Sequence, residues 1–353
     1  MPPRVAIVGG GSAGHVLPAL PVIDALVAEG STVLFIGTHS GLEQELVSGA
    51  PCEYVGISAG KLRRYVSLEN AVDVFRIIRG ILQAFGVLRR FRADVVFSKG
   101  GFVSFPVAFA AWCLRIPIVA HESDLTTGLA NRLVLPFAKT LCTSFAGTSA
   151  EASGLKVVHT GTPLRDVIRN GDAAQGRKLL GLTDHDPLIV VTGGSLGADG
   201  LNQAVVANLV ELTAIGHVFH VCGKDKMSGT QQDRYTEVEY VSEGWGDILA
   251  AADVVISRAG ANALFELVAL QKKNILIPLP KRASRGDQID NAAYADAHGW
   301  SVVLREEALS AEILTEAIRE LLNNGSRYVE KMRAEPNPNS TNAIVTEIHD
   351  VAR

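Results

Sequence analysis

Short apolar segments that alternate with helix-length segments constrain the fold of this chain more than any other feature. Ten segments, five in each half, are rich in β-branched residues and predict strands. They comprise residues 4–10, 31–37, 93–101, 116–122 and 139–145, and then 187–197, 217–223, 237–244, 252–260 and 274–280. Strands separated in this way form βαβ units with parallel sheets, whose ligands bind at the carboxyl ends of the strands. The sequence therefore predicts an α/β protein.

The two halves of the chain also resemble each other. Residues 93–101 (ADVVFSKGG) match residues 252–260 (ADVVISRAG) at an offset of 159, and the same offset carries the isoleucines of 116–122 onto those of 274–280. Each half also contains a strand that ends in a glycine loop. This repetition predicts two Rossmann-like domains with parallel sheets, facing each other across a cleft into which both glycine loops open.

Composition limits the size, location and partners of the chain. Its 353 residues are 47% hydrophobic and 20% charged, which suits two globular domains, expected over 1–162 and 163–335 because Pro163 and nearby glycines interrupt the pattern. The net charge of −4 indicates no bias toward nucleic acid. Four cysteines without a C-x-x-C spacing indicate reduced thiols and a cytosolic location. The strand-like start does not resemble a signal peptide, and no apolar run reaches the roughly 18 residues of a membrane span.

The first glycine loop, GGGSAG at residues 9–14, is suited to a phosphate. Its glycines fit the dinucleotide fingerprint G-x-G-x-x-G, but that fingerprint also needs an acid at the end of the second strand to hold a ribose. The first acid after that strand is Glu43, a spacing that argues against NAD. Small residues still let the backbone approach a ligand, and a helix N-terminus offers unpaired N–H groups. A diphosphate is therefore the expected occupant.

His15 directly follows this loop, in the first turn of the expected helix. It could be an ordinary polar residue of a helix turn. Its place beside the glycine loop favours a direct role, because a neutral imidazole can accept a proton from a hydroxyl. The helix dipole would help to keep that imidazole neutral.

The second half carries groups suited to a nucleotide sugar. Glu266 follows a strand end and a glycine turn, and its two uses would be to stabilise a helix start or to bind the hydroxyls of a ribose. Residues 192–197 (TGGSLG) repeat the phosphate loop, with Ser195 as an added donor. The polar residues Gln288 and Asn291 suit either a solvated loop or contacts to sugar hydroxyls.

Together these segments resemble the MurG family of GT-B glycosyltransferases. The matching motifs run in one order from about residue 4 to about residue 345: GGGSAGHVLPAL, SKGGFVSFP, HESDLTTGLANR, GTPLR, TGGSLGADGLN, SRAGANALFEL and RGDQIDNA. Enzymes of this family move N-acetylglucosamine (GlcNAc) from UDP-GlcNAc to the lipid-linked muramyl-pentapeptide, lipid I. The motifs are specific for the superfamily and much less specific for the acceptor.

The resemblance implies that the first domain binds the lipid-linked acceptor. His15 matches the loop histidine of the family and is a candidate base for the acceptor 4-hydroxyl. Residues 121–124 (HESD) would line the same cleft, and because some relatives have HEQN there, Asp124 is an alternative base. The choice between His15 and Asp124 stays open. The acceptor diphosphate would lie on two turns, formed by Gly11, Ser12, Ala13 and Gly14 and by Gly100 and Gly101.

The resemblance also implies that the second domain binds UDP-GlcNAc, and that residues 336–353 form a helix returning to the first domain. The donor contacts it implies are Arg165 at the nucleotide, Gly194 and Ser195 at the diphosphate, the backbone around Trp245 at the uracil, Glu266 at the ribose, and Gln288 and Asn291 at the sugar.

The implied reaction is a single displacement that inverts the anomeric carbon. The acceptor hydroxyl attacks, UDP leaves from the opposite face, and helix dipoles and loop N–H groups stabilise the leaving diphosphate. Neither a cofactor nor a metal is therefore expected. The only D-x-D motif, at residues 184–186, precedes a strand and indicates a turn rather than a metal site.

Residues 60–92 predict a surface for lipid. Eight basic residues, Arg63 and Arg64 among them, stand there against two acidic ones. The apolar residues are too many for one core stripe, although a core helix with a solvated basic face would share these features. In a domain expected to take a polyprenyl acceptor, they favour reversible attachment to the anionic inner leaflet, at the cytoplasmic face of the cell membrane. The apolar residues assigned to this contact are Phe75, Ile78, Leu82 and Phe85.

Two other functions fit the same motifs. A related enzyme could transfer GlcNAc to a nucleoside, an antibiotic or another small metabolite, because donor motifs do not specify the acceptor. A nucleotide-sugar-binding regulator or an epimerase-like enzyme would act on UDP-GlcNAc without any acceptor.

Overall fold

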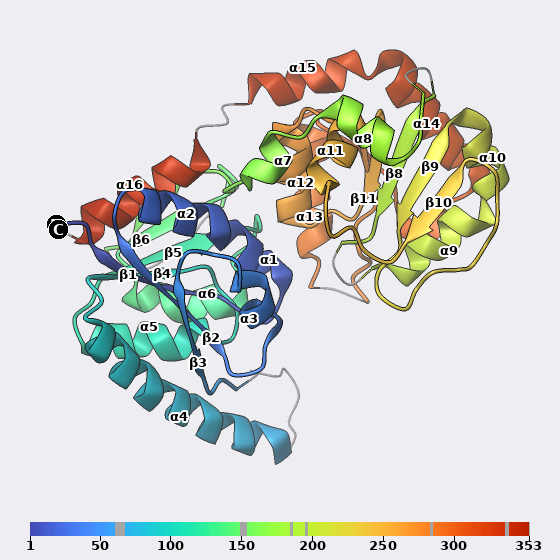
Figure 1. Ribbon diagram of the computed structural model, residues 1–353. Helices are drawn as coiled ribbons and strands as arrows, with labels where there is room; N and C mark the ends of the chain where they lie inside the picture. Colours follow the sequence, from blue (N-terminus) through green and yellow to red (C-terminus); the bar gives the residue numbers. More distant parts are fainter. Residues whose placement is uncertain are drawn as a thin grey trace. The chain divides into compact units, whose positions relative to one another are not determined.

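The chain forms two compact units, each built on its own parallel sheet (Figure 1). The computed structural model describes all residues except 61–67, 149–153, 184–185, 195–196, 283–284, 336–338 and 353, and only the backbone of residues 68–72. Unit 1 comprises Met1–Arg165 with Pro338–Arg353, and unit 2 comprises Asp166–Asn337.

Unit 1 contains a seven-stranded sheet in the order β3-β2-β1-β4-β5-β6-β7. Its strands are β1 (Arg4–Val8), β2 (Thr32–Thr38), β3 (Glu53–Ile57), β4 (Val95–Ser98), β5 (Ile118–Glu122), β6 (Thr140–Thr143) and β7 (Lys156–His159). Its helices are α1 (Ala13–Val16), α2 (Leu20–Ala28), α3 (Leu42–Val47), α4 (Leu68–Phe91), α5 (Ser104–Cys113), α6 (Leu129–Val134) and α16 (Ser340–Ala352), with 3-10 turns η1 (Leu17–Ala19) and η2 (Leu135–Phe137).

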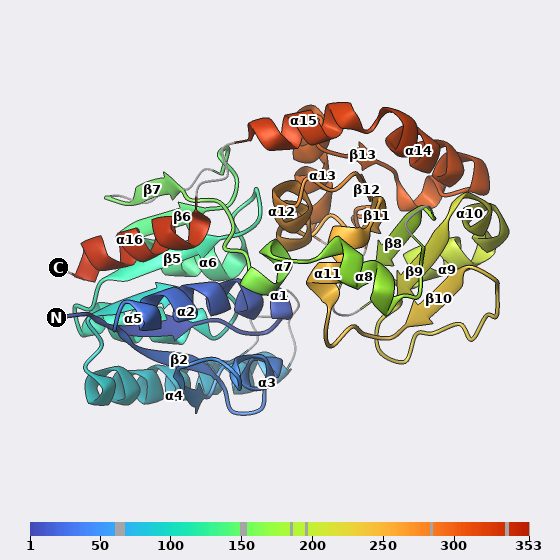
Figure 2. The ribbon, with the colours of Figure 1, turned by 45° about the horizontal axis from the view of Figure 1, so that its top comes forward.

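Both faces of this sheet are covered, and β1 shows why. Val5 and Ile7 point into one core and Ala6 and Val8 into the other, following the two-residue period of a strand. The first core receives apolar side chains from α1, α2, α3 and α16, and the second from α4, α5 and α6. Figure 2 shows the ribbons of these helices around the sheet. The continuous apolar runs of the inner strands therefore reflect burial on both sides.

Unit 2 contains a six-stranded sheet in the order β10-β9-β8-β11-β12-β13. Its strands are β8 (Leu188–Thr192), β9 (His217–Val221), β10 (Tyr235–Val238), β11 (Val254–Ser257), β12 (Asn274–Leu276) and β13 (Val302–Val303). Its helices are α7 (Asp166–Arg169), α8 (Ala173–Leu179), α9 (Asp199–Ala207), α10 (Leu209–Ile215), α11 (Trp245–Ala251), α12 (Ala261–Ala269), α13 (Asp287–Ala297), α14 (Ala311–Asn324) and α15 (Ser326–Ala334), with the 3-10 turn η3 (Glu306–Ala308).

The two sheets share one strand order if β7 is set aside. In each, the chain order reverses once, between β1 and β4 in unit 1 and between β8 and β11 in unit 2. This is the Rossmann order, and the reversal marks where such sheets bind ligands. The predicted α/β fold of two Rossmann-like domains with parallel sheets is confirmed.

The repeated ADVV motif has one structural role in both units. In unit 1 the Arg4 N–H donates to Asp94 Oδ2 (2.8 Å), and the Asp94 N–H donates to the Arg4 carbonyl (2.9 Å). In unit 2 the Leu188 N–H donates to Asp253 Oδ2 (2.8 Å), and the Asp253 N–H donates to the Leu188 carbonyl (2.9 Å). Each aspartate thus fixes the first residue of the neighbouring strand, so the repeat reflects the shared fold and not a ligand.

The constant offset of 159 does not extend to the next strand. Val96 pairs with Ile118, whereas Val255, which lies 159 residues after Val96, pairs with Asn274. The counterpart of Ile118 therefore lies 156 residues later, and the predicted match to Ile277 is wrong. An apolar pattern cannot fix register when both faces of a strand are buried.

The strands that the sequence does not predict correctly are those at the edges of the sheets. β3, β7 and β13 were not predicted, and the strand expected over 237–244 is β10, which spans Tyr235–Val238. These four are the outermost strands of the two sheets. Most of their residues are partly or fully exposed, so they lack the apolar run of an inner strand.

Candidate functional site

In unit 1 the topology brings the two predicted glycine turns together. β1 and β4 are parallel neighbours, with Val8 paired to Ser98, so their carboxyl ends lie side by side at the point of reversal. Residues 9–14 follow β1 and residues 99–101 follow β4. Fold and register therefore place all six residues predicted for the acceptor diphosphate at one edge of one sheet.

Contacts between these turns leave no space for larger residues. Gly101 has a φ of 86°, and a Cβ on it would collide with the carbonyl oxygen of Gly10. Gly11 also has a φ of 86°, and a Cβ there would lie 2.6 Å from the ring of Phe102. The backbones of the two turns thus contact each other, which only glycine at position 101 permits.

His15 lies in α1, as predicted, but that helix has only four residues. A single turn has no substantial dipole, so the expected dipole effect on His15 does not apply. A hydrogen bond does orient the ring: Nδ1 lies 3.2 Å from the carbonyl oxygen of Lys99. The side chain is half-buried, beside the turn that follows β4.

The HESD segment divides into buried and partly exposed halves, which corrects the prediction that all of it lines the site. His121 is fully buried, its Nε2 lies 3.2 Å from the carbonyl of Gly161, and burial, with the charge of Lys99, holds its pKa well below the usual value. Glu122 is also buried. Ser123 and Asp124 are half-buried, so they are the members of the segment that can meet a ligand.

Glu122 organises the loop that carries Asp124. Its Oε1 accepts the N–H of Asp124 (3.1 Å), and its Oε2 accepts the N–H of Gly128 (2.9 Å) and Nδ2 of Asn131 (2.9 Å). The buried carboxylate of Glu122 thus accepts three hydrogen bonds, from the loop and from α6. Its role is therefore to hold the loop, and sequence reasoning missed it.

Glu43 lies on α3, and its carboxylate reaches the end of β2 in space. Its buried Oε1 accepts hydrogen bonds from the N–H and the hydroxyl of Thr38, at 2.8 and 2.6 Å. A Cβ on Gly10 would lie 3.0 Å from the same oxygen. The carboxylate thus fixes the strand end and the glycine turn.

The corresponding edge of unit 2 is lined by glycines that face open space. β8 leads into Gly194 (φ 81°), β11 leads into Gly260, and Gly286 (φ 92°) precedes α13. A Cβ on any of the three would meet no other atom of the described residues within 4 Å, chain neighbours aside. Their backbones are therefore accessible to a ligand, unlike that of Gly101 in unit 1. Gly260 and Gly286 are site candidates that the sequence did not single out.

Glu266 lies at the sixth of the nine positions of α12, not near its start. The helix dipole favours an acid only in the first turn, so the stabilising explanation offered for this residue fails. Its side chain is half-buried, on the helix that follows Gly260. The ribose contact stays a prediction.

Two of the predicted sugar contacts hold unit 2 together in this structure. Gln288 Oε1 accepts the N–H of Leu279 (3.1 Å), and Asn291, fully buried, donates from Nδ2 to the carbonyl of Ala259 (3.2 Å). Asn291 thus ties α13 to the turn before α12. Both residues position the edge of the site, and their contacts to a sugar stay predictions.

The other predicted donor residues take separate positions. Trp245 begins α11, after Gly244 in a left-handed conformation (φ 74°). Arg165 is the residue directly before α7 and belongs to unit 1. Ser195 lies outside the described residues. Trp245 therefore belongs to unit 2 with the open glycines, whereas Arg165 belongs to unit 1.

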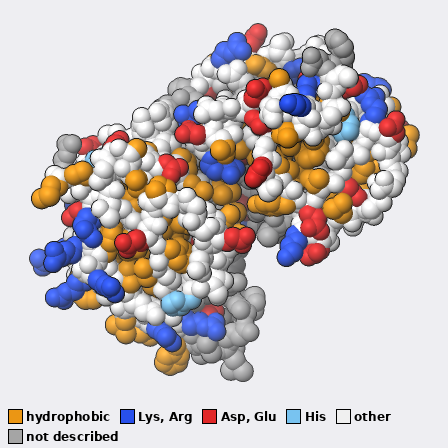
Figure 3. Space-filling view, in the orientation of Figure 1, with side chains coloured by type: hydrophobic (Ala, Val, Ile, Leu, Met, Phe, Trp, Pro, Cys, Tyr) orange, Lys and Arg blue, Asp and Glu red, His pale blue; other side chains and the backbone are white. Residues whose placement is uncertain are grey.

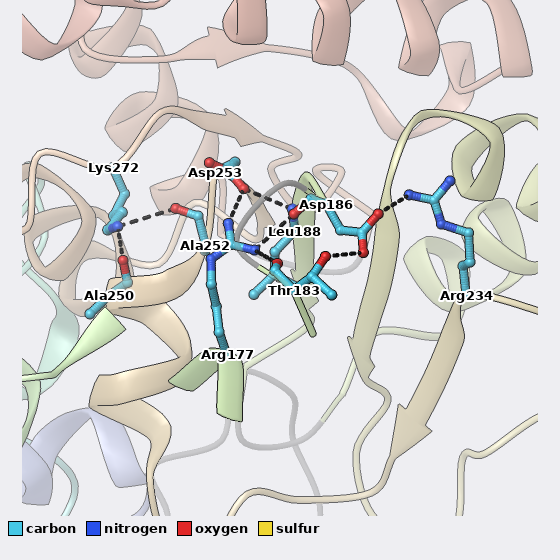
Figure 4. Close-up of polar contacts among 9 residues, drawn as sticks. All are labelled: Arg177, Thr183, Asp186, Leu188, Arg234, Ala250, Ala252, Asp253 and Lys272. Atoms are coloured by element: carbon cyan, nitrogen blue, oxygen red, sulfur yellow. Dashed lines mark hydrogen bonds and ion pairs between the residues drawn. The ribbon is translucent and has the colours of Figure 1, made fainter. Parts of the chain in front are cut away.

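Asp186, the last residue of the D-x-D motif, lies at the amino end of β8, whereas the glycines follow the carboxyl ends of the strands. Residues 184–185 are outside the described part of the chain. Asp186 accepts a hydrogen bond from Thr183 Oγ1 (2.9 Å) and pairs with Arg234 (3.2 Å), just before β8 begins (Figure 4). Asp186 is thus part of a turn at the amino end of a strand, whereas ligands bind at the carboxyl end. Over the described residues, no group of three or more His, Cys, Asp or Glu could hold a metal ion.

Two Rossmann units, each with a glycine-lined edge where the strand order reverses, define the class of the protein as a GT-B glycosyltransferase. The glycosyltransferase family 28 N-terminal domain matches residues 5–143, and the family 28 C-terminal domain matches residues 188–348. The chain belongs to glycosyltransferase family 28.

Curated relatives and a solved structure agree with this assignment. The chain is 44% identical to a protein of Clostridium kluyveri and 42% identical to one of Legionella pneumophila (strain Paris), with 98% and 100% of this chain and 98% of each relative covered. Both are named UDP-N-acetylglucosamine–N-acetylmuramyl-(pentapeptide) pyrophosphoryl-undecaprenol N-acetylglucosamine transferase. MurG of Acinetobacter baumannii superimposes with a TM-score of 0.77 at 25% identity, covering 99% of this chain and 100% of that one. The predicted family resemblance is confirmed.

Proposed function

We propose that this chain transfers GlcNAc from UDP-GlcNAc to the 4-hydroxyl of the MurNAc-pentapeptide of lipid I, giving lipid II for peptidoglycan synthesis. One observation carries the proposal: identity of 42–44% to transferases named for this reaction, over nearly the whole chain. Because the match spans both units, it includes the residues predicted for the donor and those predicted for the acceptor.

Unit 2 is the proposed site of UDP-GlcNAc. The open backbones at Gly194 and Gly260 support it, because a diphosphate needs close approach to N–H groups and favours the positive end of a helix. Glu266 would accept the two hydroxyls of the ribose, and the backbone at Trp245 would contact the uracil. These N–H groups would also stabilise the charge that develops on the departing UDP.

Unit 1 is the proposed site of the acceptor. Its diphosphate would lie on residues 11–14 and 100–101, and His15 or Asp124 would accept the proton of the 4-hydroxyl as the oxygen attacks. The new bond joins that oxygen to the anomeric carbon of GlcNAc, while the bond from this carbon to the UDP oxygen breaks. UDP leaves with its electron pair, and the α linkage becomes β.

We further propose that α4 attaches the chain to an anionic membrane. The predicted residues Phe75, Ile78, Leu82 and Phe85 are 72%, 51%, 70% and 36% exposed. Their spacing of three, four and three residues makes one stripe on the helix. The opposite stripe, which includes Ala84 and Leu88, is buried in the core.

Charge and neighbouring aromatics support this surface. Apolar and basic side chains lie next to each other on the lower part of unit 1, where α4 runs (Figure 3). Arg76, Arg79 and Arg89 on this helix are exposed, whereas Arg63 and Arg64 lie outside the described residues. On α5, which packs on α4, Trp112 is exposed and its ring lies 5.5 Å from that of Phe137. In the described residues, no helix has both the length and the apolar character of a membrane span, and peripheral attachment needs neither.

A transfer assay tests the proposed reaction. The chain is incubated with UDP-GlcNAc and a soluble lipid I analogue, with a panel of nucleosides and antibiotics, or with no acceptor. We expect UDP release and a β-linked disaccharide with the lipid I analogue alone. Turnover only with a small metabolite, or conversion of UDP-GlcNAc without any acceptor, would refute the proposed acceptor.

A further inference from the structure

Lys99 is a buried lysine at the acceptor edge of unit 1, and neither the predicted site nor the proposed function uses it. It directly follows β4 and precedes the turn Gly100–Gly101, and only 1% of the residue is exposed. Its ammonium donates from Nζ to Ser123 Oγ at 2.5 Å. Ser123 is the neighbour of Asp124, so this contact anchors the loop of one candidate base.

The backbone of the same residue holds the other candidate base. The carbonyl oxygen of Lys99 lies 3.2 Å from His15 Nδ1, and a carbonyl oxygen can only accept a hydrogen bond. In the neutral imidazole the proton is therefore on Nδ1, and the lone pair is on Nε2. The Lys99 N–H in turn donates to the carbonyl of Val8 at 2.8 Å, which fixes this backbone to β1.

The groups around the ammonium come from β5 and the loop after it. The carboxylates of Glu122 and Asp124 favour the charged lysine, and His121, which is buried beside it, is neutral. Burial outweighs the carboxylates and lowers the pKa of Lys99 to about 8. The ammonium is thus charged at neutral pH and loses its charge in a mildly alkaline range.

The matching residue of unit 2 holds the end of its strand through contacts within the fold. Arg258 follows β11 as Lys99 follows β4, and it is also buried. Its guanidinium donates to the carbonyl of Ile277 (3.1 Å) and pairs with Glu306, which tie the strand end to β12 and η3. Lys99 instead contacts the segment that carries a candidate base.

We propose that Lys99 is a positioning residue for proton transfer from the acceptor: its carbonyl oxygen fixes the imidazole of His15, and its ammonium fixes the loop that carries Asp124. This inference rests on the proposed function. Replacing the ammonium by an apolar group would release Ser123 and remove a positive charge beside two carboxylates.

Steady-state kinetics with a soluble lipid I analogue test the proposal, because they do not depend on membrane attachment. The variants are Lys99→Met, Lys99→Gln, which keeps a donor without the charge, and the control Lys139→Met, which removes an exposed lysine of the same unit. For both Lys99 variants we expect kcat to fall about 10- to 100-fold, as for misplaced acid–base groups, while KM for UDP-GlcNAc is unchanged. Lys139→Met should match the wild type.

The pH profile separates positioning from simple stability. Wild-type kcat should fall above about pH 8 as Lys99 loses its proton. In Lys99→Met this alkaline limb should disappear. A kcat and pH profile equal to the wild type in Lys99→Met would overturn the proposal, and so would a fall in kcat matched by an equal rise in the KM for UDP-GlcNAc.

Two controls keep the outcomes distinct. If the wild type itself does not turn over the lipid I analogue, the proposed function fails and not this inference alone. If Lys99→Met does not fold, Ser123→Ala decides, because it removes the acceptor of the ammonium and keeps the charge of Lys99. A several-fold loss of kcat with unchanged KM for UDP-GlcNAc supports the proposal, and an unchanged kcat overturns it.

Discussion

At the scale of single residues, the position of Glu266 in α12 removes the structural reason for an acid there. At mid-helix it gains nothing from the dipole, so a nucleotide contact is the stronger reading of its position. Glu266→Ala should raise the Kd for UDP-GlcNAc by roughly ten- to a hundredfold, because a hydrogen bond to a charged group contributes about 1.5–3 kcal/mol. Titration calorimetry measures this. Glu211→Ala, an exposed acid of the same unit, is the matched control and should bind as the wild type does.

The glycines of the two edges should respond differently to the same substitution. Gly101→Ala introduces a clash with Gly10 and a strained φ, so it should lower the free energy of unfolding by more than about 1 kcal/mol. Gly260→Ala meets open space at a φ of −67° and should leave stability almost unchanged. It should nevertheless weaken UDP-GlcNAc binding if the backbone contacts the ligand. Denaturant unfolding and calorimetry together test this, and unaltered binding in Gly260→Ala would contradict a donor contact there.

The buried charge of Lys99 has a consequence for stability as well as for catalysis. Since burial lowers its pKa from 10.5 to about 8, the unfolded chain binds the proton more tightly than the folded chain does. The cost, about 3 kcal/mol, is fully present below pH 8 and disappears as pH rises from about 8 to 10.5. Lys99→Met should therefore be more stable than the wild type at pH 7, and the difference should shrink by pH 10. Thermal unfolding at the two pH values measures it, and a less stable variant at pH 7 would contradict this reading.

At the scale of elements, the exposed stripe of α4 can be tested without disturbing the core. Phe75→Ser with Leu82→Ser should reduce binding to anionic vesicles several-fold while the turnover of a soluble acceptor stays normal, because both side chains are mainly exposed. Vesicle sedimentation measures the binding. Val210→Ser with Leu179→Ser removes two exposed apolar residues of unit 2 and serves as the control. Equal sedimentation of the two variants would argue against α4 as the attachment surface.

Inner elements could be predicted from the sequence, and edge elements could not. The inner strands β1, β4, β8 and β11 are apolar over most of their length, because both faces are buried. β7 and β13 have few buried residues, so nothing in their composition separates them from loops. In the candidate site, the glycine turns could also be predicted, because they directly follow these inner strands. The roles of Glu122 and Glu43 were not, because they depend on the geometry of the loops that bring the carboxylates back to nearby backbone and side-chain donors.

At the scale of the whole molecule, the duplicated fold explains why the two halves look alike and yet differ in chemistry. The aspartates at the strand starts keep one role in both units, whereas the cations at the strand ends diverge between Lys99 and Arg258. The sequence shows such a repeat, but it does not show whether two residues at matching positions have the same role. The C-terminal helix α16 adds a further asymmetry, since it completes a core of unit 1 with Ile344 and Ile348.

The proposal that unit 2 binds the donor and unit 1 the acceptor can be tested by hydrogen–deuterium exchange of the full chain with and without UDP-GlcNAc. Ligand should slow exchange in unit 2, at the start of α11 and along residues 258–266, and should leave residues 9–16 and 99–101 unchanged. Protection at residues 9–16 and 99–101, with none around Glu266, would contradict the assignment of donor and acceptor to the two units.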